Sequence, residues 1–372
     1  MAIYWMFLGL SLLVALWCRY KFQLVDSYGI IERRAYLIQA ILFFAVIIFF
    51  CGLRSSVADT QTYVHLFNTS ANSIGTIDWN SVVVDKGYQF LVVLYRQFIS
   101  KDFHGWLFLC SFVSGVAVMI GFWKYSYDFG MSCFLFIATT YFTYLVNGMR
   151  QFICISLVFA CTHWIIERKY IRFIILVLLL SFIHLSVVVM IPVCFFVNAK
   201  PWSWRMWLLI VVAILTGVFF DRLLPYISSL LNDTQYEGAV NYIASGSAVG
   251  SSIIRLIIAL IPPGLAFLGR RTVEEEGNNL INLLVNMSVI NLLIYFLATL
   301  TSGLVLGRVA SYFGIYNLLL LPWLLNHLFS ESSRVLLKIV CVVLYTGYFY
   351  YQMVMTWHLP YVSDILHITL WN

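Results

Sequence analysis

Long apolar runs fill most of the chain, and short polar stretches separate them. Such runs are typical of membrane helices, which need roughly 17–25 apolar residues to cross the hydrocarbon core. We expect these segments at residues 2–18, 35–53, 106–122, 130–147, 150–166, 171–197, 205–221, 252–268, 280–301, 309–328 and 335–352. The pattern predicts an all-α, polytopic integral membrane protein with about 11 transmembrane or partly re-entrant helical segments.

The positions of Lys and Arg give these segments a direction, because cytoplasmic loops carry an excess of both. We place inside the connections that contain Arg19, Lys21, Arg33, Arg34, Lys124, Arg168, Lys169, Arg172, Lys200, Arg205, Arg270, Arg271, Arg334 and Lys338. The loops 54–105 and 222–251 and the C-terminal tail then face outward. Because no basic residue precedes the first apolar run, we expect a retained helix with its N-terminus outside.

Two segments do not fit a simple crossing. Residues 171–197 have basic flanks on both sides, but at 1.5 Å per residue they reach only about 40 Å, too short for two spans. A broken or re-entrant element around His184 explains this length, and one ordinary tilted helix is the alternative. Residues 88–99 are apolar on most faces but too short to span, so we expect an interfacial helix on the outer leaflet.

The composition agrees with a single transmembrane domain over residues 1–372. Hydrophobic residues make up 62% of the chain and charged residues 10%, and the mean hydropathy is +0.91. The net charge of +6 comes from short loops, where membrane orientation explains it, so it does not indicate nucleic-acid binding. The eight cysteines lie in or beside apolar segments without a CxxC pair, which favours core packing.

Several catalytic signatures are missing from the sequence. It contains no GxxxxGK[ST] loop, no strand-led GxGxxG and no HExxH motif, so an ATP-driven pump and a zinc protease lose support. The groups that could carry chemistry are instead Arg, His, Asp and Tyr residues at the expected outer ends of helices. Ionisable groups near membrane depth are costly and usually functional.

Arg54 and Asp59 form the first such group, directly behind the second apolar run. A guanidinium can bind a diphosphate bidentately, and a nearby carboxylate can take a proton from a hydroxyl nucleophile. The alternative is a local Arg–Asp pair that only closes the loop. Between residues 222 and 251, the Ser/Gly-rich stretch 244–250 could form a mobile lid.

Three further positions could each have either a functional or a purely structural role. Arg150, followed by Gln151, lies at the start of a helix on the expected outer side. It is either an anion ligand or a snorkelling anchor. His184 is a base or acid near neutral pH, or a hydrogen-bonded core histidine. Arg308 shares a helix face with Tyr312, and both could instead belong to an aromatic belt.

Taken in order, these motifs resemble the EpsG family, and the resemblance covers nearly the whole chain. Its parts are Arg54…Asp59…Tyr63, Lys86-Gly87-Tyr88, Met149-Arg150-Gln151, the basic turn 168–172 before His184-Leu185-Ser186, Arg308…Tyr312-Phe313 and Pro360-Tyr361. That family is linked to bacterial exopolysaccharide and O-antigen polymerisation of the Wzy type. The chain departs from the pattern at Ala58, where a glycine is expected, and at Lys86, where an acid is commoner.

The resemblance implies a polymerase that joins oligosaccharide repeat units carried on undecaprenyl diphosphate, forming O-antigen, capsule or exopolysaccharide. The reaction would occur at the periplasmic, outer face of the bacterial inner membrane, in a fold that could be GT-C-like. It would need no cofactor, nucleotide sugar, ATP or metal. The implied partners are the lipid-linked glycan as donor and acceptor, the lipid bilayer, a flippase and a chain-length co-polymerase.

This chemistry assigns roles to the candidate residues. Arg54, Arg150 and Arg308 would bind the diphosphates and neutralise the charge on the leaving group. Either Asp59 or His184 would deprotonate the acceptor hydroxyl. The remaining expected substrate contacts are Tyr63, Gln151 and Tyr312.

Two other function classes fit part of the pattern. A flippase or other transporter of lipid-linked oligosaccharide would show internal repeats and ionisable groups near the midplane, whereas the charges here gather at the outer ends. A different polyprenyl-phosphate-dependent glycan transferase or ligase would use the same chemistry, and the sequence does not separate it from a polymerase.

Overall fold

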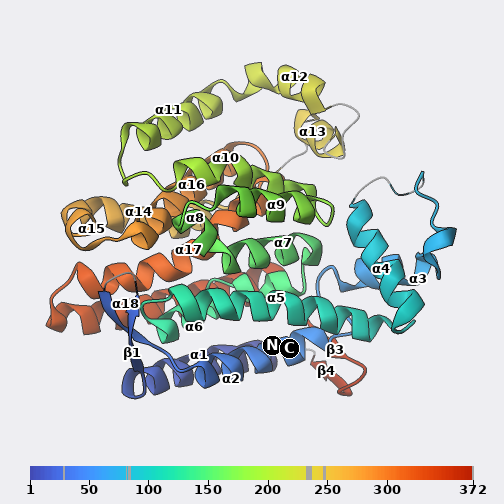
Figure 1. The fold of residues 1–372 in the computed structure, drawn as a ribbon, viewed down its shortest axis with the longest axis horizontal. Helices are drawn as coiled ribbons and strands as arrows, with labels where there is room; N and C mark the ends of the chain where they lie inside the picture. Colours follow the sequence, from blue (N-terminus) through green and yellow to red (C-terminus); the bar gives the residue numbers. More distant parts are fainter. Residues whose placement is uncertain (28–29, 81, 83–84, 232–236, 246–248, 371–372) are drawn as a thin grey trace. The chain divides into compact units, whose positions relative to one another are not determined.

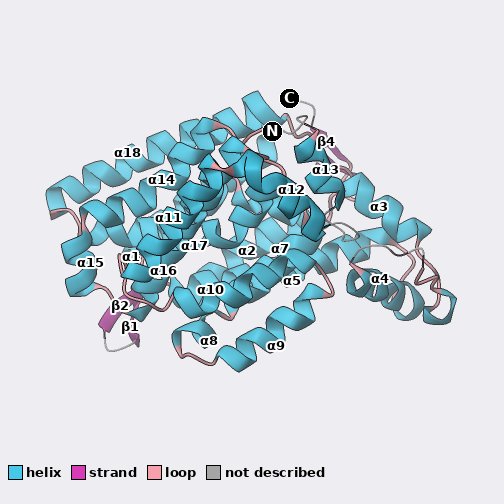
Figure 2. Cartoon of the chain, turned by 90° about the horizontal axis from the view of Figure 1, so that it is seen from above, coloured by secondary structure: helices cyan, strands magenta, loops and turns pink. Residues whose placement is uncertain are grey.

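The chain is almost entirely helical, with two short antiparallel strand pairs (Figure 2). The computed structural model describes residues 1–372 except 28–29, 81, 83–84, 232–236, 246–248 and 371–372. The predicted all-α class is confirmed. The chain forms two compact units: the first comprises Met1–Trp164, Ile171–Val188 and Phe329–Asn372, and the second Ile165–Tyr170 and Val189–Leu328.

The first unit is a helical bundle around the long helix α5. Its helices are α1 (Ala2–Tyr20), α2 (Leu37–Gly52), α3 (Thr60–Thr69), η1 (Ile74–Thr76), α4 (Lys86–Phe98), α5 (Phe103–Tyr125), α6 (Phe129–Ala138), α7 (Met149–Ala160), α9 (Tyr170–Ser181) and α18 (Glu331–Tyr350). Helix α5 packs against α2 and α7, and α6 packs against α1 and α18. The shorter helices α3 and α4 gather at the N-terminal end of α5 (Figure 1).

The second unit is built on the pair α16 and α17. Its helices are α10 (Met190–Phe196), α11 (Trp204–Val218), α12 (Phe220–Leu231), α13 (Glu237–Ala244), α14 (Ile253–Leu268), α15 (Arg270–Glu276), α16 (Asn279–Leu300) and α17 (Val305–His327). Two amide donors are satisfied between α16 and α17: Asn291 Nδ2 donates to the Ala310 carbonyl at 2.8 Å, and Asn317 Nδ2 to Asn291 Oδ1 at 3.0 Å. The predicted loop 222–251 is partly helical, and residues 246–248 of its expected lid lie outside the described residues.

Both strand pairs belong to the first unit. Strands β1 (Gln23–Ser27) and β2 (Ile30–Arg34) form a hairpin between α1 and α2, and β3 (Tyr361–Ser363) pairs with β4 (Ile368–Leu370). The Tyr361 hydroxyl donates to the Phe50 carbonyl at 2.8 Å. The C-terminal tail therefore covers the end of α2.

Helix length separates two classes of apolar segment. In the described part of the chain, five helices are long and apolar enough to cross a membrane: α1, α5, α16, α17 and Glu331–Trp357, which is α18 continued by the π-helical turn η4 (Tyr351–Trp357). The pair α14 and α15, bent by 72°, raises this to six if it counts as one span. Among the described residues, six further apolar helices have only 10–17 residues. The protein is a multi-pass membrane protein.

Several predicted segments are helical but interrupted. The segment 130–147 becomes α6 and a 3₁₀ turn, η2 (Tyr141–Leu145), and 150–166 becomes α7 and α8 (Thr162–Ile166). At the first break, Thr139 Oγ1 donates to the Leu135 carbonyl at 2.6 Å and Thr140 has a φ of 64°. Threonine hydroxyls that bond backbone carbonyls compete with the helix ladder, which hydropathy alone does not reveal.

The two segments that did not fit a simple membrane crossing, 171–197 and 88–99, are both helical in the structure. Residues 171–197 are broken, because α9 ends at Ser181 and helical structure resumes with η3 (Leu185–Val189) and α10. The expected break is confirmed, and the alternative of one continuous helix is wrong. Residues 88–99 lie in α4, as predicted, whereas the interfacial position of this helix stays a prediction.

Candidate functional site

Asp85, the N-cap residue of α4, has an unusual backbone conformation. Its φ of 52° is left-handed, a region that non-glycine residues rarely adopt and that Asp tolerates better than most. Its side chain is only 4% exposed and makes no capping hydrogen bond to α4. A strained, buried carboxylate persists only where its surroundings hold it in place, and such positions cluster at functional sites.

Gly87 brings the start of α4 against the end of α9. Its N–H donates to the Phe182 carbonyl oxygen at 2.8 Å. A Cβ at this position would lie 2.6 Å from that oxygen, so only glycine allows the two backbones to approach this closely. The approach places Asp85 beside the turn that follows α9.

His184 lies in this turn, which its own N–H closes by donating to the Leu180 carbonyl at 3.0 Å. Its Nδ1 is 3.1 Å from Oδ2 of Asp85. Because a carboxylate only accepts, we assign the proton of the neutral ring to Nδ1, which leaves Nε2 as a proton acceptor. The side chain is 23% exposed, so part of the ring lies at the protein surface.

Arg150 occupies the first turn of α7. The N-cap residue of this helix is Gly148, with a φ of 67°, which has no side chain to cap the helix. Nη1 of Arg150 lies 2.8 Å from Oδ2 of Asp85, and the Arg150 side chain is 28% exposed. An uncapped helix N-terminus favours anions, and so does a guanidinium.

Two tyrosine rings hold the guanidinium of Arg150. Its Cζ is 5.9 Å from the ring centroid of Tyr63 and 5.7 Å from that of Tyr88, within cation–π range. Trp106 Nε1 donates to the Tyr88 hydroxyl at 3.0 Å. Burial raises the pKa of Tyr63 and raises the pKa of Tyr88 well above its usual value, so both phenols stay neutral.

One oxygen of Asp85 has spare capacity. Oδ2 accepts from Arg150 and His184, whereas Oδ1 is buried and has no hydrogen-bond partner among the residues that the structure describes. Leaving a buried acceptor unsatisfied costs about 1–3 kcal/mol. Such an atom in a native structure calls for an explanation, and a bound hydroxyl group would supply the missing donor.

A protein-family model, the EpsG family, matches residues 37–363 and thus most of the chain. The chain belongs to the EpsG family. EpsG proteins are Wzy-like polymerases, and membership supports a polysaccharide polymerase-type function in the broad sense. No curated protein and no solved structure matches the chain.

This EpsG protein brings together three of the residues selected from the sequence, Tyr63, Arg150 and His184. The sequence reasoning missed Asp85, to which both Arg150 and His184 are bonded. A signal was present, since this acid directly precedes the Lys86-Gly87-Tyr88 motif. Within the described ranges, no three His, Cys, Asp or Glu side chains are grouped to hold a metal ion.

Arg54 has a structural environment. It is 0% exposed, and its guanidinium donates to Thr60 Oγ1 at 2.8 Å, Ser111 Oγ at 3.2 Å, Met149 Sδ at 2.6 Å and the Cys51 carbonyl. Direct contact with a diphosphate, as predicted, does not fit this geometry, because the protein surrounds the guanidinium. Arg54 instead ties the turn after α2 to α3, α5 and α7.

Asp59 is half-buried at the N-cap position of α3 and makes no side-chain capping bond. Its carbonyl accepts from the N–H groups of Thr62 and Tyr63 at 3.0 and 3.3 Å. The guanidinium of Arg54 bonds to Thr60, the residue that follows Asp59. The predicted catalytic role of Asp59 stays a prediction.

The other three predicted contacts differ in exposure. Gln151 is buried on α7, next to Arg150. Arg308 and Tyr312 belong to α17 in the second unit, where Arg308 is exposed and Tyr312 is 1% exposed. Their expected contacts with substrate stay predictions.

Proposed function

We propose that this protein is a glycosyltransferase that joins oligosaccharide repeat units carried on undecaprenyl diphosphate, at the outer face of the bacterial inner membrane. One observation carries the proposal: Asp85 accepts from both the guanidinium of Arg150 and the imidazole of His184. A lipid-diphosphate donor brings its own leaving group. The protein then needs only a cation for the diphosphate and an acceptor for the hydroxyl proton.

Arg150 is the proposed diphosphate ligand. Its Nη1 bonds Asp85, and its side chain also interacts with the Tyr63 hydroxyl. A guanidinium has five N–H donors in total, so other donors remain for phosphate oxygens. The N-terminus of α7 adds a partial positive charge at the same place. Together they would stabilise the charge that develops on the departing diphosphate.

His184 is the proposed base, and Asp85 is the residue that orients it. The acceptor hydroxyl oxygen forms a bond to the anomeric carbon of the donor sugar, while its proton moves to Nε2 of His184. The bond from that carbon to the diphosphate oxygen breaks, and undecaprenyl diphosphate leaves with the electron pair. The Asp85 carboxylate at Nδ1 stabilises the imidazolium that forms, as in other carboxylate–imidazole pairs.

The test is elongation of a lipid-linked repeat unit by the purified protein, without nucleotide or metal. We expect polymer from the wild type, almost none from Arg150→Ala, and wild-type yield from the control Arg172→Ala, whose side chain is exposed at the start of α9. Wild-type protein that fails on its cognate substrate would overturn the proposal. Transfer of a single unit to another acceptor, without elongation, would identify a ligase or decorating transferase instead.

A further inference from the structure

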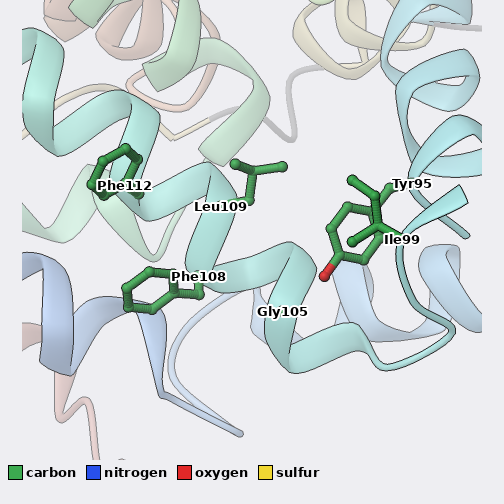
Figure 3. Close-up of a pocket in the computed structure, with 6 residues that line it drawn as sticks. All are labelled: Tyr95, Ile99, Gly105, Phe108, Leu109 and Phe112. Carbon is green, nitrogen blue, oxygen red and sulfur yellow. The ribbon is translucent and has the colours of Figure 1, made fainter.

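An apolar groove lies between the end of α4 and the first half of α5, in the first unit (Figure 3). Tyr95 and Ile99 line it from the α4 side, and Gly105, Phe108, Leu109 and Phe112 line it from α5. Its volume of about 340 Å³ falls within the range of small-molecule pockets, roughly 300–1,000 Å³. The lining is almost wholly hydrocarbon and aromatic, which selects an apolar ligand.

We propose that this groove holds the prenyl chain of the lipid diphosphate whose head group binds at Arg150. The inference rests on the proposed function and adds to it a binding site for the lipid tail. Three observations support it: the proximity of the groove to the site, its depth along α5, and the apolar character of its opening.

The groove and the candidate site are neighbours, because packed aromatic rings connect a residue of each. The guanidinium of Arg150 lies over the Tyr88 ring, and the Trp106 ring contacts Tyr88 at 5.6 Å and Tyr95 at 5.4 Å between centroids. Tyr88 and Tyr95 are seven residues apart on α4, about 10 Å along the helix axis. A lipid with its diphosphate at Arg150 would therefore reach the groove with its first few isoprene units.

The depth along α5 agrees with a lipid chain. This helix starts at Phe103 on the expected outer side, and Lys124 marks its expected cytoplasmic end. Phe108 and Phe112 are five and nine residues from the start, about 8 and 14 Å along the axis. That level corresponds to the outer half of the hydrocarbon core, directly below a head group at the membrane surface.

The opening is apolar and accessible from the membrane. Phe112 is 46% exposed and Ile99 is 69% exposed. At the inner end the Tyr95 hydroxyl points toward Gly105 (Figure 3), where an added Cβ would collide with it. Glycine at 105 thus leaves room for the Tyr95 hydroxyl against α5 at this end of the groove.

The test uses a photo-crosslinking prenyl diphosphate, a C20 chain with a diazirine at its tail, and the purified protein in nanodiscs. We expect mass spectrometry to find the label on Phe108 or Phe112, and the same chain without its diphosphate to label these residues at least about tenfold less. Leu109→Trp fills the groove and should reduce the labelling by a similar factor. The matched control is Leu42→Trp, at a leucine on α2 that is 49% exposed, and it should change nothing.

Equal labelling of α2 and α5, independent of the diphosphate and of Leu109→Trp, would show that the probe contacts the protein only as ordinary bilayer lipid does. That result would overturn the proposal that the groove binds the prenyl chain. The readout is binding, so it is separate from polymerisation. If the protein is labelled in the groove but forms no polymer, the groove proposal stands and the proposed polymerase function fails. If the protein forms polymer but its Leu109→Trp variant is labelled as strongly as the wild type, the proposed function stands and the groove proposal fails.

Discussion

Asp85 and His184 are 99 residues apart in the chain, yet Nδ1 of His184 lies 3.1 Å from Oδ2 of Asp85. The same oxygen accepts from Arg150 at 2.8 Å. One buried carboxylate thus orients a candidate base and a candidate anion ligand together. Changes at Asp85 should therefore affect the catalytic rate more than changes at any neighbouring carboxylate.

Asp85→Asn preserves the shape of the side chain and removes its charge. We expect the elongation rate to fall by about 10²-fold or more, because His184 loses the group that orients it and stabilises its imidazolium. Initial rates with lipid-linked substrate measure the effect. Asp78→Asn, at an exposed position of the same loop, is the control. A folded Asp85→Asn protein with wild-type rates would remove Asp85 from the mechanism.

Gly87→Ala tests the contact that positions the site. The new Cβ would lie 2.6 Å from the Phe182 carbonyl oxygen, so α4 or the end of α9 must shift, at a cost of about 1–3 kcal/mol. We expect a lower melting temperature and a loss of elongation. Gly75→Ala should leave both unchanged, because nothing lies within 4 Å of its Cβ. Equal behaviour of the two variants would show that the close approach is not needed.

Tyr88→Phe tests how the buried phenol of Tyr88 makes the stability of the fold depend on pH. Burial places the folded-state pKa of Tyr88 well above the unfolded value near 10, so its stabilising contribution is present below about pH 10 and is lost as the pH rises further. At pH 8 the variant should be less stable by about 1 kcal/mol, since Trp106 loses its acceptor. Near pH 11 this difference should shrink, because the variant has no phenol to ionise on unfolding.

Melting temperatures at the two pH values measure the change. Tyr20→Phe is the control, because Tyr20 is 74% exposed and its substitution should give no pH-dependent difference. A constant gap between wild type and Tyr88→Phe from pH 8 to 11 would contradict the role of burial at Tyr88.

The helical class followed from hydropathy, because every predicted apolar segment is helical in the structure. The lengths of the helices did not follow. At Thr139 and Thr140 the chain leaves α6, where a hydroxyl bonds the preceding turn and the backbone turns left-handed. These are local hydrogen-bonding effects, and an average over about 19 residues does not detect them.

The site was predictable only in part, for a related reason. The break at His184 followed from the basic residues at both ends of a segment too short for two spans. The position of Asp85 before the Lys86-Gly87-Tyr88 motif did not identify its partners, because they are 65 and 99 residues away and one sequence does not reveal tertiary contacts. For Arg54, a charge behind a membrane helix suggests a ligand site, whereas the structure shows donors of its guanidinium bonded to Thr60 and Ser111.

A matched pair of variants, Arg54→Lys and Arg150→Lys, separates a structural arginine from a ligand-binding one. Lysine cannot reproduce the planar fork of donors. Arg54 is buried and bonds Thr60 and Ser111 on separate elements, so its variant should lower the melting temperature, with KM for the lipid-linked donor unchanged in the protein that folds. In Arg150→Lys the charge beside Asp85 remains. Its fold should therefore persist, while KM rises about tenfold because bidentate binding of phosphate is lost. Unchanged KM in Arg150→Lys, or raised KM in a stable Arg54→Lys, would contradict this assignment and would favour diphosphate binding at Arg54, in the turn after α2.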